Sequence, residues 1–212
     1  MKEEFWHDKW KRNDIGFHEA AGNSLLTEFF SSLSLSPGDR IFLPLCGKTK
    51  DIAWLLEQNI SVVGCELNEE AVKQLFSEMA VIPQVSQVGN LKCYSGANID
   101  IFVGNIFDLG REELGPVVAI YDRAALVALP TDIREQYVRH LMAITQVAPQ
   151  LLVSFEYEQT QMPGPPFSVG SRLIYEYYDA DYSLQVLATR DVVGGLKGKV
   201  PAREEAWLLT PK

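Results

Sequence analysis

The chain alternates short apolar runs with amphipathic segments, and this alternation limits its fold more than any other feature of the sequence. Residues 41–43 form an apolar run, and the next segment places Ile52, Leu55 and Leu56 on one face of a short helix. A second apolar run at residues 61–67 is again followed by an amphipathic helical pattern. Two strand–helix units in succession are typical of a parallel sheet covered by helices on both faces.

The same alternation continues to the end of the chain. The seven predicted strands lie in residues 41–43, 61–67, 99–109, 117–126, 151–157, 183–189 and 205–210. A long helix is predicted over residues 131–148, ending before Pro149, with Thr131 as its expected N-cap. We therefore expect an α/β fold, a three-layer sandwich whose seven-stranded sheet is mostly parallel, with one antiparallel strand near the C-terminus.

Length and charge limit the possible partners. The 212 residues fit a single domain, 1–212, and residues 1–36 precede the strand–helix pattern and are expected to form a flap over the sheet edge. A formal net charge of −9 argues against a nucleic-acid or anionic-membrane partner. The amino terminus lacks the apolar core of a signal peptide, and no segment is long and apolar enough to span a membrane, so we expect a cytoplasmic location.

Three cysteines without C-x-x-C spacing argue against a disulfide framework or a metal site. Cys65 lies within an apolar run, which is typical of a small core residue. Cys46 lies in the segment after the first strand, and the sequence assigns it no role.

Chemistry in an open α/β sheet is expected beyond the carboxyl ends of its strands. The first strand is followed by "PLCGK", with Gly47, and the second ends on Glu66, nineteen positions later. A carboxylate at that place accepts two hydrogen bonds from the vicinal hydroxyls of a ribose. The alternative is that Gly47 is only a turn residue with positive φ and Glu66 a solvated acid at a helix start.

The scarcity of glycines in this turn distinguishes between cofactors. A pyrophosphate needs several close backbone N–H groups and hence the pattern G-x-G-x-x-G, which "PLCGK" lacks. Binding of NAD is therefore disfavoured. S-adenosylmethionine has a ribose but no phosphate, so a bulkier turn with one glycine suits it.

Seven segments, in order along nearly the whole chain, resemble the thiopurine S-methyltransferase family of class I S-adenosylmethionine-dependent enzymes. They are "FWHDKWKRNDIGFHE", "FLPLCGK", "VVGCELNEEAV", "NIFDL", "YDRAALVALP", "EYEQ…PGPPFSV" and "WLLTPK". The most diagnostic are "PLCGK" and "DRAALVAL". The resemblance implies a Rossmann-like methyltransferase fold of the bacterial type.

The resemblance also implies roles for the matching residues. The residues implied to bind S-adenosylmethionine are Trp10, Leu45, Gly47, Glu66, Asn105, Ile106 and Arg123, and Phe17 is implied to face the acceptor substrate. Trp10 would cover the cofactor, Glu66 would hold its ribose, and Arg123 would reach the cofactor site and extend toward the acceptor side. No residue is assigned as a catalytic base.

Each role has a structural alternative. Trp10, four residues after Trp6, also fits a helix that docks through aromatic side chains, and Arg123 also fits an ion pair with Asp122. The segment before the last strand, "RDVVGGLKGKVPARE", is shorter than is typical of the family and has no arginine directly before "GGLKG". We expect Arg190, Lys197 or Lys199 to supply the acceptor-side cation.

The expected reaction is methyl transfer from S-adenosylmethionine, giving S-adenosylhomocysteine, to the sulfur of an aromatic or heterocyclic thiol such as a thiopurine. Alternatives within the fold are a selenium or tellurium methyltransferase, connected with metalloid resistance, and a halide or simple-thiol methyltransferase. A nicotinamide-dependent oxidoreductase and a non-catalytic adenosyl-ligand sensor are alternatives of other classes. We expect a small-molecule substrate and a monomer.

Overall fold

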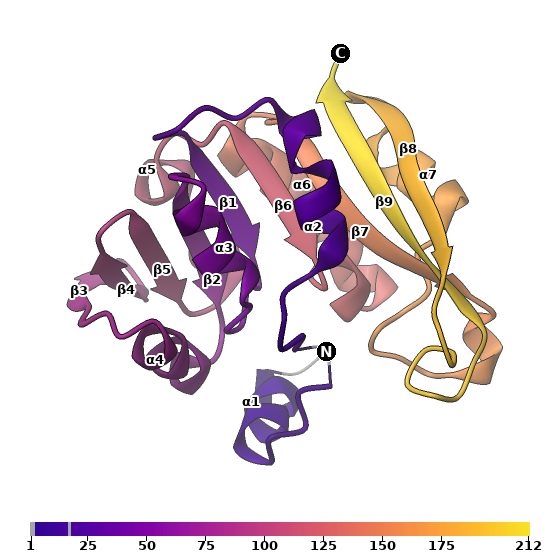
Figure 1. The fold of residues 1–212 in the computed structure, drawn as a ribbon, viewed down its shortest axis with the longest axis horizontal. Helices are drawn as coiled ribbons and strands as arrows, with labels where there is room; N and C mark the ends of the chain where they lie inside the picture. The colour runs from indigo at the N-terminus through magenta and orange to yellow at the C-terminus, as the bar shows by residue number, and fades with distance from the viewer. Residues whose placement is uncertain (1–2, 17) are drawn as a thin grey trace.

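A nine-stranded sheet forms the centre of the molecule in a computed structural model that describes residues 3–16 and 18–212. The strand order is β3-β4-β5-β2-β1-β6-β7-β9-β8 (Figure 1). The strands are β1 (Arg40–Pro44), β2 (Ser61–Glu66), β3 (Gln84–Val88), β4 (Leu91–Gly96), β5 (Ile99–Val103), β6 (Ala119–Arg123), β7 (Gln150–Tyr157), β8 (Tyr182–Asp191) and β9 (Ala202–Pro211).

The middle of the sheet is parallel, as the sequence predicts. β5, β2, β1, β6 and β7 pair in parallel, and β9 is antiparallel to both β7 and β8. Pro44 lies opposite Cys65, and Glu66 lies opposite Val103. The ends of these strands, and the turns after them, therefore meet at one edge of the sheet.

The prediction of seven strands was wrong because it missed the hairpin β3–β4. β4 is antiparallel to β5, and β3 is antiparallel to β4. β3 is exposed over most of its length and includes Gln84, Ser86 and Gln87, so it lacks the apolar run used to detect the other strands. This hairpin extends the sheet beyond β5 and adds a second reversed strand at the far edge from β9.

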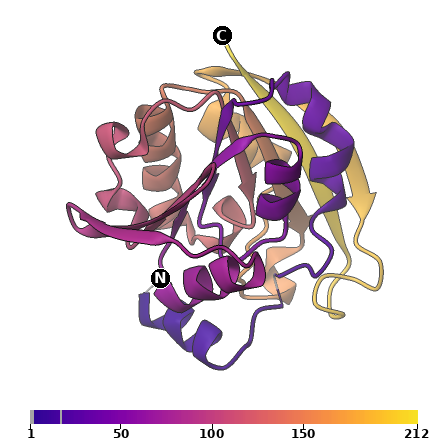
Figure 2. The same cartoon turned by 60° about the vertical axis from the view of Figure 1, so that its left-hand side comes forward.

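One face of the sheet is covered by α2 (Ser24–Phe29), η1 (Phe30–Leu33), α3 (Asp51–Glu57) and α4 (Glu69–Glu78). Leu25 and Leu26 of α2 are fully buried in the same core cluster as Ile41 of β1. Within residues 1–36, therefore, α2 belongs to a layer of the sandwich, and α1 (Glu3–Lys11) is the part that lies over the sheet edge (Figures 1 and 2).

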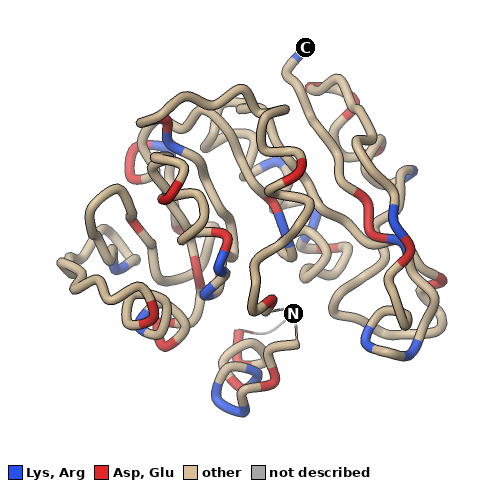
Figure 3. The backbone as a smooth tube through the Cα atoms, viewed as in Figure 1, with Lys and Arg blue, Asp and Glu red and all other residues tan. Residues whose placement is uncertain are grey.

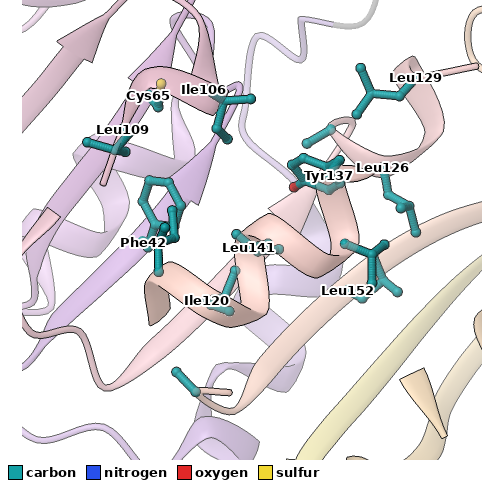
Figure 4. Packing of buried hydrophobic residues seen from close by; sticks show 14 of the residues in the cluster. Phe42, Cys65, Ile106, Leu109, Ile120, Leu126, Leu129, Tyr137, Leu141 and Leu152 are labelled. Carbon is teal, nitrogen blue, oxygen red and sulfur yellow. The ribbon is translucent and has the colours of Figure 1, made fainter. Parts of the chain in front are cut away.

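The opposite face is covered by η2 (Ile106–Asp108), α5 (Arg111–Leu114), η3 (Leu126–Ala128), α6 (Thr131–Thr145) and α7 (Ser171–Tyr178). Tyr137 and Leu141 of α6 pack against Phe42, Ile120 and Leu152 of the central strands (Figure 4). The third layer of the predicted sandwich is thus present. A further short helix, η4 (Gln159–Gln161), lies in the long connection between β7 and α7.

The starts of α4 and α6 are capped differently. Asn68 caps α4, since its side chain accepts a hydrogen bond from the N–H of Ala71. The prediction of Thr131 as the cap of α6 was wrong: Pro130 occupies the N-cap position, and no side-chain cap bond is made. Among the described residues, no helix is long and apolar enough to cross a lipid bilayer.

Candidate functional site

The turn after β1 and the end of β2 meet at the carboxyl edge of the sheet. Because β1 and β2 are parallel and in register, the residues that follow Pro44 and Cys65 emerge side by side. The N–H of Gly47 donates a hydrogen bond to Oε2 of Glu66 at 2.8 Å. The two residues linked by their spacing in the sequence are therefore in direct contact.

Glu66 is held on both of its carboxylate oxygens. Oε2 accepts from Gly47, and Oε1 accepts from the N–H of Asn68, also at 2.8 Å. The side chain is only 6% exposed, so the alternative of a solvated acid at a helix start is wrong. Burial raises the pKa of Glu66, while the N–H donors oppose that rise. Each carboxylate oxygen has two lone-pair directions, so both retain capacity for a hydroxyl donor.

The backbone of the turn after β1 is left-handed at two positions. Leu45 has φ of +47° and Gly47 has φ of +55°. A Cβ on Gly47 would lie 3.2 Å from Cζ2 of Trp10, so a side chain there would press on the indole ring. Trp10 is itself 8% exposed and belongs to α1. Gly47 is thus a turn residue with positive φ, and the indole ring of Trp10 packs against it.

Helix α1 is docked across this edge by polar contacts as well as by Trp10. Nδ2 of Asn105 donates to Oε1 of Glu3 at 2.9 Å. Nδ2 of Asn68 lies 3.1 Å from Nδ1 of His7. Sequence reasoning missed Glu3, His7 and Asn68 as site residues, because no local pattern indicates which strand end a terminal helix will contact. α1 therefore covers the ends of β1, β2 and β5.

Asn105 and Ile106 form the turn after β5, next to Glu66. The side chain of Asn105 accepts from the N–H of Phe107 at 3.0 Å and so caps η2. Ile106 is buried in the core beneath this turn (Figure 4). The structure places both residues at the same sheet edge as Gly47 and Glu66, with Asn105 toward α1 and Ile106 toward the core.

Arg123, at the end of β6, forms an ion pair with Glu19 from the segment between α1 and α2. The alternative prediction, an ion pair of Arg123 with Asp122, was wrong, because the partner is Glu19. Asp122 is fully buried and accepts from the hydroxyl of Tyr137 at 2.6 Å and from the N–H of Leu126 at 3.1 Å. Burial raises the pKa of Asp122 to about 6.

Glu19 belongs to a network that ties the amino-terminal segment to the sheet. Nδ2 of Asn23 donates to Glu19, and the N–H of Asn23 donates to Oδ1 of Asp51 at 2.7 Å. The hydroxyl of Tyr121 donates to Oδ2 of Asp51 at 3.2 Å. These four residues were not identified from the sequence; the i, i+4 spacing of Glu19 and Asn23 is the only local signal, and their partners are distant in sequence.

The acceptor-side residues are partly described. Phe17 lies outside the described residues. Arg190 pairs with Glu28 of α2, whereas Nζ of Lys197 donates to the carbonyl of Pro165 at 2.6 Å. Burial lowers the pKa of Lys197, and the positive charge of Lys9 in α1 lowers it further. Figure 3 shows basic residues in the loop between β8 and β9, at the same end of the molecule as α1.

The thiol of Cys46 is packed in the core rather than presented to the site. Its Sγ would lie 2.8 Å from a Cβ on Gly64, and burial raises its pKa well above the ordinary value, with Glu66 adding to the rise. A neutral, buried thiol is a poor nucleophile. Within residues 3–16 and 18–212, no group of three His, Cys, Asp or Glu side chains is arranged to hold a metal.

A parallel sheet with a buried, oriented carboxylate at the end of its second strand is the arrangement of a Rossmann-like fold that binds a ribose-containing cofactor. A solved SAM-dependent methyltransferase from Anabaena variabilis has the same fold, with a TM-score of 0.66, 13% sequence identity and coverage of 98% of this chain and 94% of that one. At that identity the likeness concerns the fold alone.

Sequence comparison is more specific. The model of the family "Thiopurine S-methyltransferase (TPMT)" matches residues 1–210. The thiopurine S-methyltransferase of Xanthobacter autotrophicus is 50% identical over 210 residues, covering 99% of both chains. That of Teredinibacter turnerae is 49% identical over 210 residues, covering 99% of this chain and 98% of the other. The chain belongs to the thiopurine S-methyltransferase family.

Proposed function

We propose that the chain transfers the methyl group of S-adenosylmethionine to the sulfur of aromatic or heterocyclic thiols, thiopurines among them. The observation that carries the proposal is the contact between Gly47 and Glu66, which fixes a buried carboxylate beside a turn with a single glycine. That arrangement suits a ribose without a pyrophosphate. Family membership supports the choice of sulfur as acceptor.

The residues at the sheet edge fit the cofactor. Glu66 would accept the two ribose hydroxyls through its remaining lone pairs, and Asn105 and Ile106 would flank the adenine. Leu45 and Gly47 would line the methionine end, and Trp10 would cover it, in keeping with its contact to Gly47. Bound S-adenosylmethionine supplies an electrophilic methyl group on a sulfonium sulfur.

The contribution of the chain to the reaction is alignment and exclusion of water. Trp10, in α1, would close the edge against solvent, and Arg123, held in place by its ion pair with Glu19, would present guanidinium N–H donors where a thiolate acceptor approaches. Holding the reacting atoms in line contributes several kcal/mol to lowering the barrier. Heteroaryl thiols ionise near neutral pH, so a positioned cation is of more use than a general base. Phe17 and Lys197 would border the acceptor.

The test is methyl transfer from radiolabelled S-adenosylmethionine to a panel of acceptors, run beside calorimetry with S-adenosylhomocysteine. We expect turnover with 6-mercaptopurine well above that with iodide or selenite. Higher turnover with selenite or iodide would assign the metalloid or halide reaction instead. Binding of the product without transfer to any acceptor would identify a sensor, and failure to bind it would overturn the proposal. A monomeric state and a cytoplasmic location stay predictions.

A further inference from the structure

The structure contains a large recess on the side of the sheet covered by α6 and α7. Its volume is about 600 Å³, and its walls come from the N-terminus of α6, the end of β7, the segment between β7 and α7, and the start of α7. Pro130, Pro163, Phe167 and Leu173 give it apolar walls, and Arg134 is part of its lining. Such a volume accommodates a small organic molecule.

Arg134 is the unusual member of this lining. It is 2% exposed, and its Nη2 donates to the carbonyl of Leu129 at 2.9 Å, while the guanidinium lies over the ring of Phe167 at 5.8 Å. Nε has no hydrogen-bond partner. Among the described residues, no carboxylate lies within 4.0 Å of the guanidinium. A buried cation without a neutralising acid is costly, so an anion beside it would be stabilising.

The start of α6 adds positive potential at the same place. Leu129, whose carbonyl binds Arg134, directly precedes Pro130 at the N-cap of this helix of fifteen residues. Because the N-cap residue makes no side-chain bond, the first N–H groups of α6 are not satisfied by a cap. The guanidinium and the helix N-terminus therefore lie together.

One acidic residue, Glu156, also lines the recess. Its carboxylate lies against Gly170, the N-cap residue of α7, so it faces the start of the other helix. Asp132, in the first turn of α6, is exposed and is not part of the lining. The recess is thus lined by one buried guanidinium, at the start of α6, and one carboxylate, which lies against the start of α7.

We propose that this recess binds a small organic anion, with a phosphate or carboxylate head against Arg134 and the N-terminus of α6 and an apolar body against Phe167 and the prolines. Arg172, at the start of α7, is largely exposed and forms only a long, solvent-exposed ion pair of 3.8 Å with Glu176, so its guanidinium remains available at the rim. The site does not depend on the methyltransferase reaction, because none of its residues is assigned to the cofactor or the acceptor.

The test is calorimetry at constant ionic strength with phenyl phosphate, cyclohexanecarboxylate and the uncharged cyclohexylmethanol. We expect saturable binding of at least one of the two anions and no binding of the alcohol. The anion that binds more tightly identifies the preferred head group, phosphate or carboxylate. Arg134→Gln removes the charge-assisted hydrogen bond to the anion and should weaken binding of the anion about ten-fold or more. Arg139→Gln, on the same helix but exposed and paired with Glu135, should leave the affinity unchanged.

Two measurements keep the test decisive if Arg134→Gln unfolds. Arg172→Gln removes only an exposed side chain, and it should weaken binding of the anions a few-fold. In ¹⁵N-labelled wild-type protein, the anions should shift the backbone N–H signals of Thr131 and Asp132. Absence of anion binding, equal binding of the alcohol, or shifts confined to residues near Arg123 and Lys197 would each overturn the proposal.

Discussion

The N–H of Gly47 and Oε2 of Glu66 are joined by a hydrogen bond of 2.8 Å that links the turn after β1 to the end of β2. The same carboxylate accepts from Asn68, at the N-cap of α4. One buried acid thus fixes two segments of the site at once. A change at Glu66 is therefore expected to affect both the proposed ribose contact and the shape of the turn.

Glu66→Ala should weaken binding of S-adenosylhomocysteine by about 1–3 kcal/mol, because two ribose hydroxyls lose their acceptor. Calorimetry measures this directly, and circular dichroism checks that the variant is folded. Glu70→Ala, in the exposed first turn of α4, is the matched control and should bind as the wild type does. A folded Glu66→Ala protein with unchanged affinity would contradict the assignment.

Gly47→Ala should lower the free energy of unfolding by roughly 1–2 kcal/mol, since an L-residue at φ +55° is strained and its Cβ would press on Trp10. The double variant with Trp10→Phe removes the ring atoms that Cβ would meet, and so it should recover part of the folding stability lost in Gly47→Ala. Thermal denaturation of the single and double variants measures this. If the losses of folding stability in the two single variants simply add in the double variant, Trp10 does not pack against residue 47.

Glu19 and Arg123 should behave as a coupled pair in catalysis. We expect Glu19→Gln and Arg123→Met to lower kcat/KM for a thiol, with the double variant less impaired than the sum by about 0.5–3 kcal/mol. The exposed pair of Glu135 and Arg139 on α6 is the control, and its neutralisation should change kcat/KM little. If the losses of kcat/KM in the two single variants simply add in the double variant, Glu19 does not position Arg123.

Asp122 should make the folded state less stable as pH rises. Its pKa is raised by burial from 3.8 to about 6, so the neutral form is favoured in the folded state. Its stabilising contribution is complete below the unfolded pKa and is lost as pH rises through about 6, amounting to roughly 3 kcal/mol at about 1.4 kcal/mol per pKa unit. Urea denaturation from pH 4 to pH 7 measures this.

Asp122→Asn is the control for that pH dependence, since an amide keeps an acceptor for Leu126 and does not ionise. The pKa of Glu66 is also raised, so Asp122→Asn is expected to keep some pH dependence of its own. The contribution of Asp122 is therefore the difference between the pH profiles of wild type and Asp122→Asn. Equal slopes for the two proteins would show that Asp122 does not titrate in this range.

The parallel centre of the fold was predictable because strands buried on both faces are apolar without interruption. β3 was not, because its exposed polar residues carry no such signal, and β4 was missed with it. The position of Gly47 and Glu66 at one sheet edge followed from the rule that parallel strand ends meet, whereas the hydrogen bond between them was not predicted. The partner of Arg123 was not predicted either, because Glu19 lies 104 residues away and no pattern links them.

Helix α1 contacts three turns that are also proposed to hold the cofactor, through Trp10, His7 and Glu3. A spent cofactor under such a cover leaves only when those contacts break together. We therefore expect the exchange of product for fresh cofactor to set an upper limit on turnover that faster chemistry would not raise. Solvent viscosity, rather than acceptor reactivity, should govern the rate once the acceptor is saturating.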